Sequence, residues 1–308
     1  MNRLPTDQFI AEIAGQKREV NLEGNSKNKD CRKAVFVLKE FCYYKFIMAI
    51  LVEANAKINL ELKILGKRND GYHQIEGIYQ SIDVSDFLFF EKVERDVFLG
   101  AINCPSSEEI ILKSKQVLEK SLGKKLPCLI HLHKAIPIAA GMGGGSADAA
   151  ATLLGLNKLY QLSLSREKLA EIGLKIGTDV VFLLYGGTCK VKGIGEKITP
   201  IEKNVSPFFI IFRPHKRLES KKMFQLYDET GKSFFELAKE ICPDTGILEE
   251  KIKKFPIKEF GLSGKGPTVF CGVSDYKSAE KIASCWPEFN GDIFICQPTK
   301  KAIHITNL

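Results

Sequence analysis

The clearest pattern of hydrophobic and polar residues in the chain is an alternation over residues 57–64. Apolar side chains occupy the even positions from Ile58 to Ile64, and polar side chains occupy the odd positions between them. A period of two residues is typical of a β-strand with one buried face. Lys57 and Asn59 therefore share the polar face of this predicted strand.

Similar patterns predict strands and helices along the rest of the chain. Up to Pro200 they predict a turn at 69–71 and strands within 75–91 and 128–134. They also predict helices over 107–121, from the glycine-rich segment to about 160, and from 165 to between 173 and 177. Beyond Pro200 they predict strands over 208–212, 268–273 and 292–296 and a helix over 277–286. This mixture favours the α+β class.

A chain of 308 residues with 44% hydrophobic content can bury a full core and is long enough for two domains. Composition changes near Pro200, so we expect domains over 48–200 and 201–308. Residues 1–47 mix both charge signs without sustained periodicity, and we expect a poorly ordered extension there. One hypothesis is that Met48 is the functional start of the protein.

Charge and cysteine content limit the class of protein. The net charge of +8 is modest and forms no basic stripe interleaved with aromatic residues, which favours anionic small molecules over nucleic acid as partners. Nine scattered cysteines without a CxxC pair indicate a reducing compartment. The sequence has no apolar run of membrane-spanning length and no secretory signal, so we expect a cytoplasmic protein without membrane partners. Its oligomeric state is not predictable from the sequence.

The glycine-rich segment Pro137–Ala150, with the sequence PIAAGMGGGSADAA, is the strongest candidate for binding chemistry. Glycines can adopt positive φ and turn several backbone N–H groups toward an anion. Ser146 is expected to open the helix that follows, where its hydroxyl and the helix dipole favour phosphate. A flexible linker is the alternative, but linkers are rarely followed at once by an alanine-rich helix.

The segment differs from two familiar phosphate loops. The chain contains no GxxxxGK[ST] string, and Ser146 stands where GxGxxG requires its third glycine. Two histidines separated by one residue, His131 and His133, could suggest a metal pair. No third ligand is evident near them, so we interpret them as an exposed strand face.

Three motifs in order resemble the GHMP kinases. They are ANAKINLELKILGKRNDGYH at 54–73, the glycine-rich segment with GTDVVF at 177–182, and LSGKGPTVF at 262–270. The Lys-x-Asn pair followed by DGYH resembles the members whose substrate carries a cytidine diphosphate group. The resemblance extends from about residue 54 to about residue 295.

This resemblance implies a fold, an activity and a co-substrate. The implied fold has a nucleotide domain like domain 2 of ribosomal protein S5 and a ferredoxin-like second domain, with the active site between them. The implied reaction transfers the γ-phosphoryl group of ATP, with Mg²⁺, to a hydroxyl of a small molecule that carries cytidine diphosphate. The alternatives are a GHMP kinase for another small alcohol, such as homoserine or mevalonate, and a non-catalytic sensor of ATP and a sugar-like ligand.

The resemblance also assigns roles to residues. Asp179 would accept the proton of the substrate hydroxyl, and Lys57 would stand beside it. The residues expected along the ATP phosphates are Pro137, Ala140, Gly141, Met142, Gly143, Gly144, Gly145 and Ser146. Those expected to bind the substrate are Asn59, Tyr72, His73, Phe224, Gly264 and Gly266. The sequence assigns no protein ligand to Mg²⁺, and Ser146 is the only candidate.

Phosphoryl transfer makes these residue types suitable. Its loose transition state needs little deprotonation of the nucleophile, so an ordinary carboxylate such as Asp179 suffices. By itself, an aspartate in an apolar run is more often a helix cap or a buried hydrogen-bond partner. Several positions depart from the usual family pattern; among them, Val181 stands where proline is common, and Lys265 replaces a small residue and adds a charge near the expected phosphates.

Overall fold

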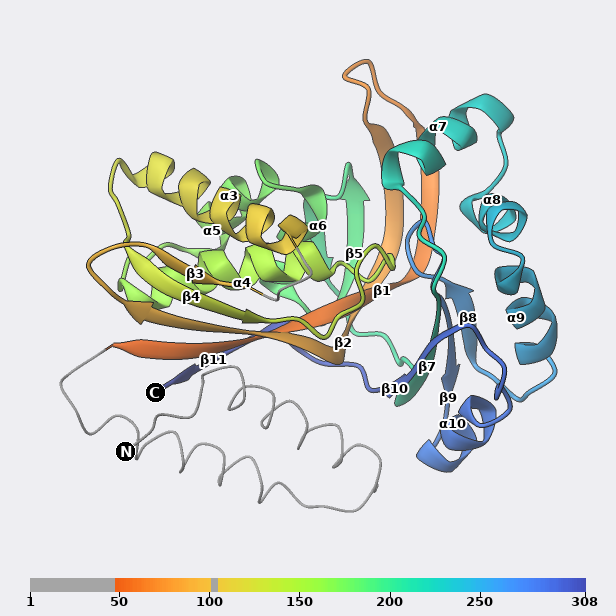
Figure 1. Ribbon diagram of the computed structural model, residues 1–308. Helices are drawn as coiled ribbons and strands as arrows, with labels where there is room; N and C mark the ends of the chain where they lie inside the picture. Colours follow the sequence, from red (N-terminus) through yellow and green to blue (C-terminus); the bar gives the residue numbers. More distant parts are fainter. Residues whose placement is uncertain (1–47, 101–104) are drawn as a thin grey trace.

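The computed structural model describes residues 48–100 and 105–308, which form two β-sheets with helices packed on them (Figure 1). The expected N-terminal extension, residues 1–47, lies outside the described residues. The first sheet has seven strands and the second has four within the described part of the chain. This mixed architecture confirms the predicted α+β class.

The first sheet has the central order β11-β1-β2-β4-β3, and β5 and β6 extend it from β2. Its strands are β1 (Ala49–Lys67), β2 (His73–Lys92), β3 (Val97–Leu99), β4 (Cys128–His133), β5 (Thr188–Gly193), β6 (Lys197–Pro200) and β11 (Ile303–Asn307). The β11 strand pairs antiparallel with β1, so the end of the chain returns to the first sheet. The domain boundary near Pro200 stays a prediction.

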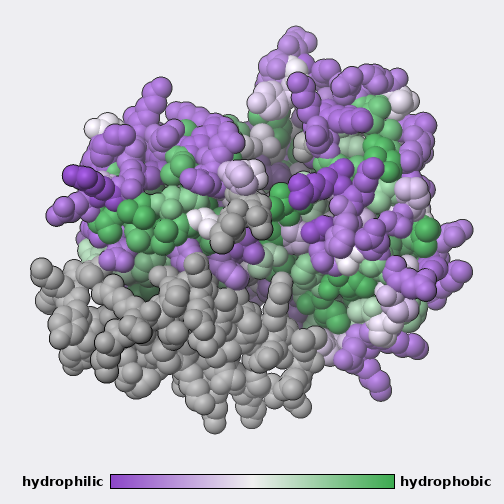
Figure 2. All heavy atoms as spheres, in the orientation of Figure 1, coloured by the Kyte–Doolittle hydropathy of each residue, from purple (hydrophilic) through white to green (hydrophobic). Residues whose placement is uncertain are grey.

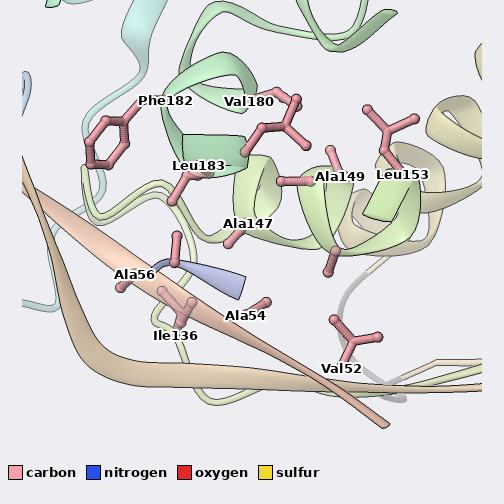
Figure 3. Packing of buried hydrophobic residues seen from close by; sticks show 14 of the residues in the cluster. Val52, Ala54, Ala56, Ile136, Ala147, Ala149, Leu153, Val180, Phe182 and Leu183 are labelled. Carbon is pink, nitrogen blue, oxygen red and sulfur yellow. The ribbon is translucent and has the colours of Figure 1, made fainter. Parts of the chain in front are cut away.

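Four helices cover one face of the first sheet in Figure 1. They are α3 (Pro105–Leu122), α4 (Gly144–Leu159), α5 (Arg166–Leu174) and α6 (Thr178–Tyr185). Helix α4 lies directly on β1 and β2, and the other three pack around it. Figure 3 shows small side chains, Ala54 and Ala56 of β1 and Ala147 of α4, between strand and helix. These fully buried alanines let the helix approach the strand closely.

The second sheet is antiparallel with the order β10-β7-β9-β8. Its strands are β7 (Phe208–Pro214), β8 (Glu259–Leu262), β9 (Val269–Val273) and β10 (Gly291–Cys296), and its helices are α7 (Ser220–Thr230), α8 (Phe234–Ile241), α9 (Asp244–Ile252) and α10 (Tyr276–Ala283). β1 contacts β8, which brings the loop after β8 to the first sheet.

The hairpin of β1 and β2 extends beyond the first sheet and packs against α7 and α8 (Figure 1). Leu62 and Ile64 of β1 contact a small apolar cluster that includes Met223 and Phe234. The hairpin tip is thereby held beside α7. This contact places the DGYH turn next to the helix that carries Phe224.

The surface drawn in Figure 2 is mostly hydrophilic, with smaller apolar areas between the polar residues. Within residues 48–100 and 105–308, every helix is too short or too polar to cross a bilayer. Six cysteines in this part of the chain are free thiols, and five of them are buried.

Candidate active site

Lys57 and Asn59 lie side by side on β1 and are both buried, with 3% and 2% of their surface exposed. The ammonium group of Lys57 donates a hydrogen bond of 2.5 Å to Oδ1 of Asn59. The alternation predicted that this face would be exposed, but β1 is buried on both faces around these residues. The face is covered because two glycine-containing loops close over it, at 141–143 and 263–266.

The first of these loops runs from Ala139 to Gly143 and adopts positive φ at alternate residues. The φ angles are 55° at Ala139, 73° at Gly141 and 74° at Gly143. Such alternation turns successive N–H groups to one side and forms an anion-binding concavity. Ala139 holds this conformation at a cost of about 1–2 kcal/mol, which is typical of strained functional loops.

Helix α4 begins at Gly144 with Gly143 as its N-cap, so Ser146 lies inside the first turn and caps nothing. This corrects the expectation that Ser146 opens the helix. Gly144 packs tightly on the preceding segment, since a Cβ there would lie 3.0 Å from Cγ2 of Ile136 and from Nζ of Lys134. The free N–H groups of this turn join those of the loop, as at other phosphate-binding helix N-termini.

Lys57 contacts the loop through backbone and side chain. Its N–H donates to the carbonyl oxygen of Met142 at 2.9 Å. A Cβ on Gly143 would lie 3.0 Å from Cγ of Lys57, so the loop backbone packs directly on the lysine stem. The structure therefore brings together the predicted phosphate loop and the predicted catalytic lysine.

Asp179 lies in the first turn of α6, which follows the extended N-cap Gly177. Its Oδ2 is 3.5 Å from Nζ of Lys57, and its side chain is 35% exposed. Residues 178–185 are apolar in the sequence apart from the first two, and they form this helix. The helix N-terminus favours a negative charge at this point.

The loop after β8 completes the cluster from the second sheet. The hydroxyl of Ser263 donates a hydrogen bond of 2.9 Å to the carbonyl oxygen of Gly141, which joins the two loops. Gly264 and Gly266 have φ angles of 62° and 79°. A Cβ on Gly264 would lie 3.3 Å from Oδ1 of Asn59, so only a glycine fits beside the polar pair.

Tyr79 on β2 lies beside Lys57 and Asn59, and no sequence motif pointed to it. Nζ of Lys57 lies 5.1 Å from its ring centroid, within the range of a cation–π contact. Burial, and then the charge of Asp179, raise the pKa of Tyr79 well above its usual value. This tyrosine stays neutral, and the face of its ring contacts the ammonium group of Lys57.

The side-chain amide of Asn59 is buried beside Tyr79. Its amide affects the pKa of Tyr79, so the two side chains are neighbours. Its buried Nδ2 has no hydrogen bond of ordinary geometry within this part of the chain. A buried donor without a partner is costly, so an acceptor oxygen of a bound molecule would suit this position.

A buried ionic network supports the start of α4, and this was also not predicted. Nζ of Lys134 lies 2.5 Å from Oδ2 of Asp86 and 2.8 Å from Oδ2 of Asp148. Oδ1 of Asp86 also accepts the N–H groups of Ala135 and Ile136. These contacts fix the segment that leads from β4 into the glycine loop.

The two carboxyl groups of this network differ. Burial, and then the neighbouring Asp86, raise the pKa of Asp148 well above its usual value. The alternation of residue types in the sequence gave no signal for the network, because its members are 14 and 48 residues apart from Lys134.

A second group of predicted residues lies where the hairpin tip meets α7. The rings of His73 and Phe224 are stacked, with centroids 4.6 Å apart and an interplanar angle of 19°. Nε2 of His73 lies 2.6 Å from Oδ1 of Asp228, whose Oδ2 also accepts a hydrogen bond from Lys67. Hydrogen bonds from Lys67 and then His73 lower the pKa of Asp228. A planar base could stack on such a platform.

Tyr72 is not part of this stack in the structure. It lies in the turn between β1 and β2, and 56% of its surface is exposed. Its N–H donates to Oδ1 of Asp70, which holds the DGYH turn closed.

The interpretation of the histidine pair on β4 as an exposed face was wrong for His131. This residue is 2% exposed, and His133 is partly buried. Within the described residues, no three His, Cys, Asp or Glu side chains form a group that could hold a metal ion.

The assembled geometry suits transfer of a phosphoryl group to a hydroxyl. A carboxylate, an ammonium group, an unused amide donor and a concave run of N–H groups converge from β1, α4, α6 and the loop after β8. Such a site can bind a polyphosphate, stabilise charge on the group in transfer and accept a proton. The fold and the site together define a small-molecule kinase.

Comparison with known proteins agrees with this class. The family described as "GHMP kinases N terminal domain" matches residues 109–187, which include the glycine loop and Asp179. Among solved structures, a 4-(cytidine 5'-diphospho)-2C-methyl-D-erythritol kinase superposes with a TM-score of 0.68 at 22% identity and covers 80% of this chain and 98% of that one. A homoserine kinase from Cytophaga hutchinsonii has a TM-score of 0.66 at 14% identity. The resemblance to GHMP kinases is thereby confirmed, and their fold is present here.

Sequence relatives define the family more narrowly. A 4-diphosphocytidyl-2-C-methyl-D-erythritol kinase from Carboxydothermus hydrogenoformans is 36% identical over 76% of this chain and 91% of the relative. One from Listeria monocytogenes serotype 4a is 31% identical over 84% of this chain and the whole of the relative. The chain belongs to the 4-diphosphocytidyl-2-C-methyl-D-erythritol kinase family.

Proposed function

We propose that this protein transfers the γ-phosphoryl group of ATP to the 2-hydroxyl of 4-diphosphocytidyl-2-C-methyl-D-erythritol. The products are the 2-phosphate and ADP, and the reaction belongs to non-mevalonate isoprenoid biosynthesis. The observation that carries the proposal is the 3.5 Å contact between Lys57 and Asp179 beside the glycine loop. The family relationship supplies the substrate.

In this proposal the residues divide the work. The N–H groups of residues 141–146 bind the ATP phosphates, and Asp179 orients the substrate hydroxyl and finally accepts its proton. Lys57 stabilises charge on the phosphoryl group in transfer. Nδ2 of Asn59 donates to an oxygen at the acceptor end of the substrate, since it lies beside Lys57 and makes no hydrogen bond of ordinary geometry in the described structure.

The cytosine ring is assigned to the stack of His73 and Phe224. Tyr72 is exposed in the adjacent turn at the hairpin tip, and in this proposal its side chain covers the ring. Gly264 and Gly266 let the loop after β8 approach the substrate without side chains in the way.

Mg²⁺ is expected to arrive with ATP, because it binds phosphate oxygens and water with few protein ligands. When bound, it would neutralise phosphate charge. Ser146, half-buried in the first turn of α4, is the residue that would lie next to it. We further propose a cytoplasmic location, which the free buried thiols fit.

Turnover of a panel of alcohols with ATP, followed by mass spectrometry, tests the proposal. The panel contains 4-diphosphocytidyl-2-C-methyl-D-erythritol, homoserine and mevalonate. Phosphorylation of the cytidyl compound alone is expected. Phosphorylation of homoserine or mevalonate in its place would refute the substrate assignment, and absence of turnover with ATP bound would favour a sensor.

A further inference from the structure

Lys265 lies in the loop between β8 and β9, at the edge of the site just described. Its side chain is partly buried, and its Nζ lies 5.2 Å from the ring centroid of Phe224. It therefore contacts the aromatic stack assigned to the base. Its loop neighbour Gly264 faces Asn59 and Lys57 at the other end of the site.

The charges of Lys57 and Asp179 also act on the ammonium group of Lys265. Burial lowers the pKa of Lys265, the carboxylate of Asp179 acts in the opposite direction, and the charge of Lys57 adds to the lowering. Charges influence one another in this way only over short distances. The ammonium group thus lies beside Phe224 and within electrostatic range of Lys57 and Asp179.

A cavity of about 510 Å³ opens in front of Lys265. Gly141 of the phosphate loop and Gly266 line it on one side, and Arg217, Glu219 and Lys221 line it at the start of α7. Three cationic side chains and one carboxylate give this cavity a positive charge. A cavity of net positive charge favours an anionic ligand.

The proposed substrate has an anion at the required place. Its diphosphate separates the cytosine ring from the alcohol that is phosphorylated, so it must lie between the base site and the catalytic pair. We propose that Lys265 binds this diphosphate and makes the enzyme prefer substrates that carry one. The inference rests on the proposed function, because it takes the positions of base and hydroxyl from it.

Calorimetric binding of two probes, cytidine and cytidine 5'-diphosphate, tests the inference. The variant Lys265→Met keeps the length of the side chain and removes its charge. Loss of a charged hydrogen bond is worth about 1.5–3 kcal/mol, so we expect cytidine 5'-diphosphate to bind at least about tenfold more weakly. Cytidine should bind within about twofold of the wild type, and Lys265→Arg should recover most of the lost affinity.

Two controls separate this role from others. Lys222→Met removes an exposed lysine of α7 that does not line the cavity, and it should change neither affinity. A non-hydrolysable ATP analogue should bind Lys265→Met as tightly as the wild type. If Lys265→Met does not fold, Lys265→Gln carries the same measurement.

The outcomes distinguish the inference from the proposed function. Equal weakening of cytidine and cytidine 5'-diphosphate would show that Lys265 supports only the base site and would overturn the inference. Weakening of the ATP analogue instead would place Lys265 on the ATP phosphates and would also overturn it. A wild-type protein that binds neither cytidine probe would refute the proposed function together with the inference.

Discussion

Gly143 packs directly on the side chain of Lys57: a Cβ on the glycine would lie 3.0 Å from Cγ and 3.2 Å from Cε of the lysine. The glycine also has a φ of 74°. The glycine loop and Lys57, the proposed phosphate loop and catalytic lysine, are therefore one packed unit. A change in the loop backbone moves the ammonium group relative to Asp179.

Gly143→Ala should lower kcat strongly and the melting temperature only slightly. The positive φ costs an alanine about 1–2 kcal/mol, and the methyl group must displace Lys57. We expect kcat to fall by at least about tenfold, measured in steady-state assays, with a small decrease in melting temperature. Gly246→Ala on α9, where the nearest atom would be 3.6 Å away, is the matched control and should leave kcat unchanged. Equal kcat for both variants would contradict the packing argument.

The network around Lys134 predicts unequal effects for its two carboxyl groups. Asp86 accepts two backbone N–H groups and Lys134, whereas Oδ1 of Asp148 has no hydrogen-bond partner among the described residues. Asp86→Asn should lower the free energy of unfolding by about 3–5 kcal/mol, because it leaves buried Lys134 poorly paired. Asp148→Asn should cost about 1 kcal/mol, because burial already disfavours its charge. Urea unfolding measures both, and equal losses would refute this assignment.

Phe224→Leu tests the base site. The leucine keeps an apolar contact but removes the ring that stacks on His73. Loss of aromatic stacking is worth about 0.5–1.5 kcal/mol, so KM for the cytidyl substrate should rise by about two- to tenfold while kcat changes little. Phe235→Leu removes a ring that packs on Phe260 instead and should leave KM unchanged. A lower kcat at constant KM for Phe224→Leu would place the residue elsewhere in the mechanism.

Glu119 on α3 predicts a pH dependence of stability. Burial opposes its ionisation, but hydrogen bonds from Lys115, from the N–H of Leu126 and from Lys125 outweigh burial and lower the pKa of Glu119 below 4.5. The stabilisation is thus fully present above pH 4.5 and is lost as the pH falls through the lowered pKa.

The variant Glu119→Gln isolates this contribution. It should lower the free energy of unfolding by about 1–3 kcal/mol at neutral pH. The difference from the wild type should shrink once the pH falls below the ordinary value of 4.5, as urea titrations at several pH values would show. A difference that is constant into strong acid would mean that the carboxylate charge contributes nothing.

Local patterns predicted many of the longer elements of the fold. The strand at 57–64 and the helices after the glycines and after Ser165 were found in this way. Short strands such as β3 and β6, and β11 at the end of the chain, gave no such signal, because pairing with distant strands stabilises them. Tertiary pairing, rather than local propensity, decides these segments.

The residues of the candidate site that lie in sequence motifs were predictable. Those that reach the site only through contacts made by the fold were not. Lys57, Asp179 and His73 stand in recognisable motifs, Phe224 was assigned through the family resemblance, and the structure brings them into two groups. Tyr79 and the Lys134 network act from buried positions that only the fold brings together. The burial of Lys57 itself depends on two loops far from it in the sequence.

The central claim is that Asp179 and Lys57 carry out phosphoryl transfer at the glycine loop. The single-turnover rate of Asp179→Asn with ATP and the cytidyl substrate tests it most directly, with binding of an ATP analogue measured in parallel. We predict that the rate falls by about 10²–10⁴-fold while the analogue binds within about twofold of the wild type. A rate close to that of the wild-type protein would contradict the claim.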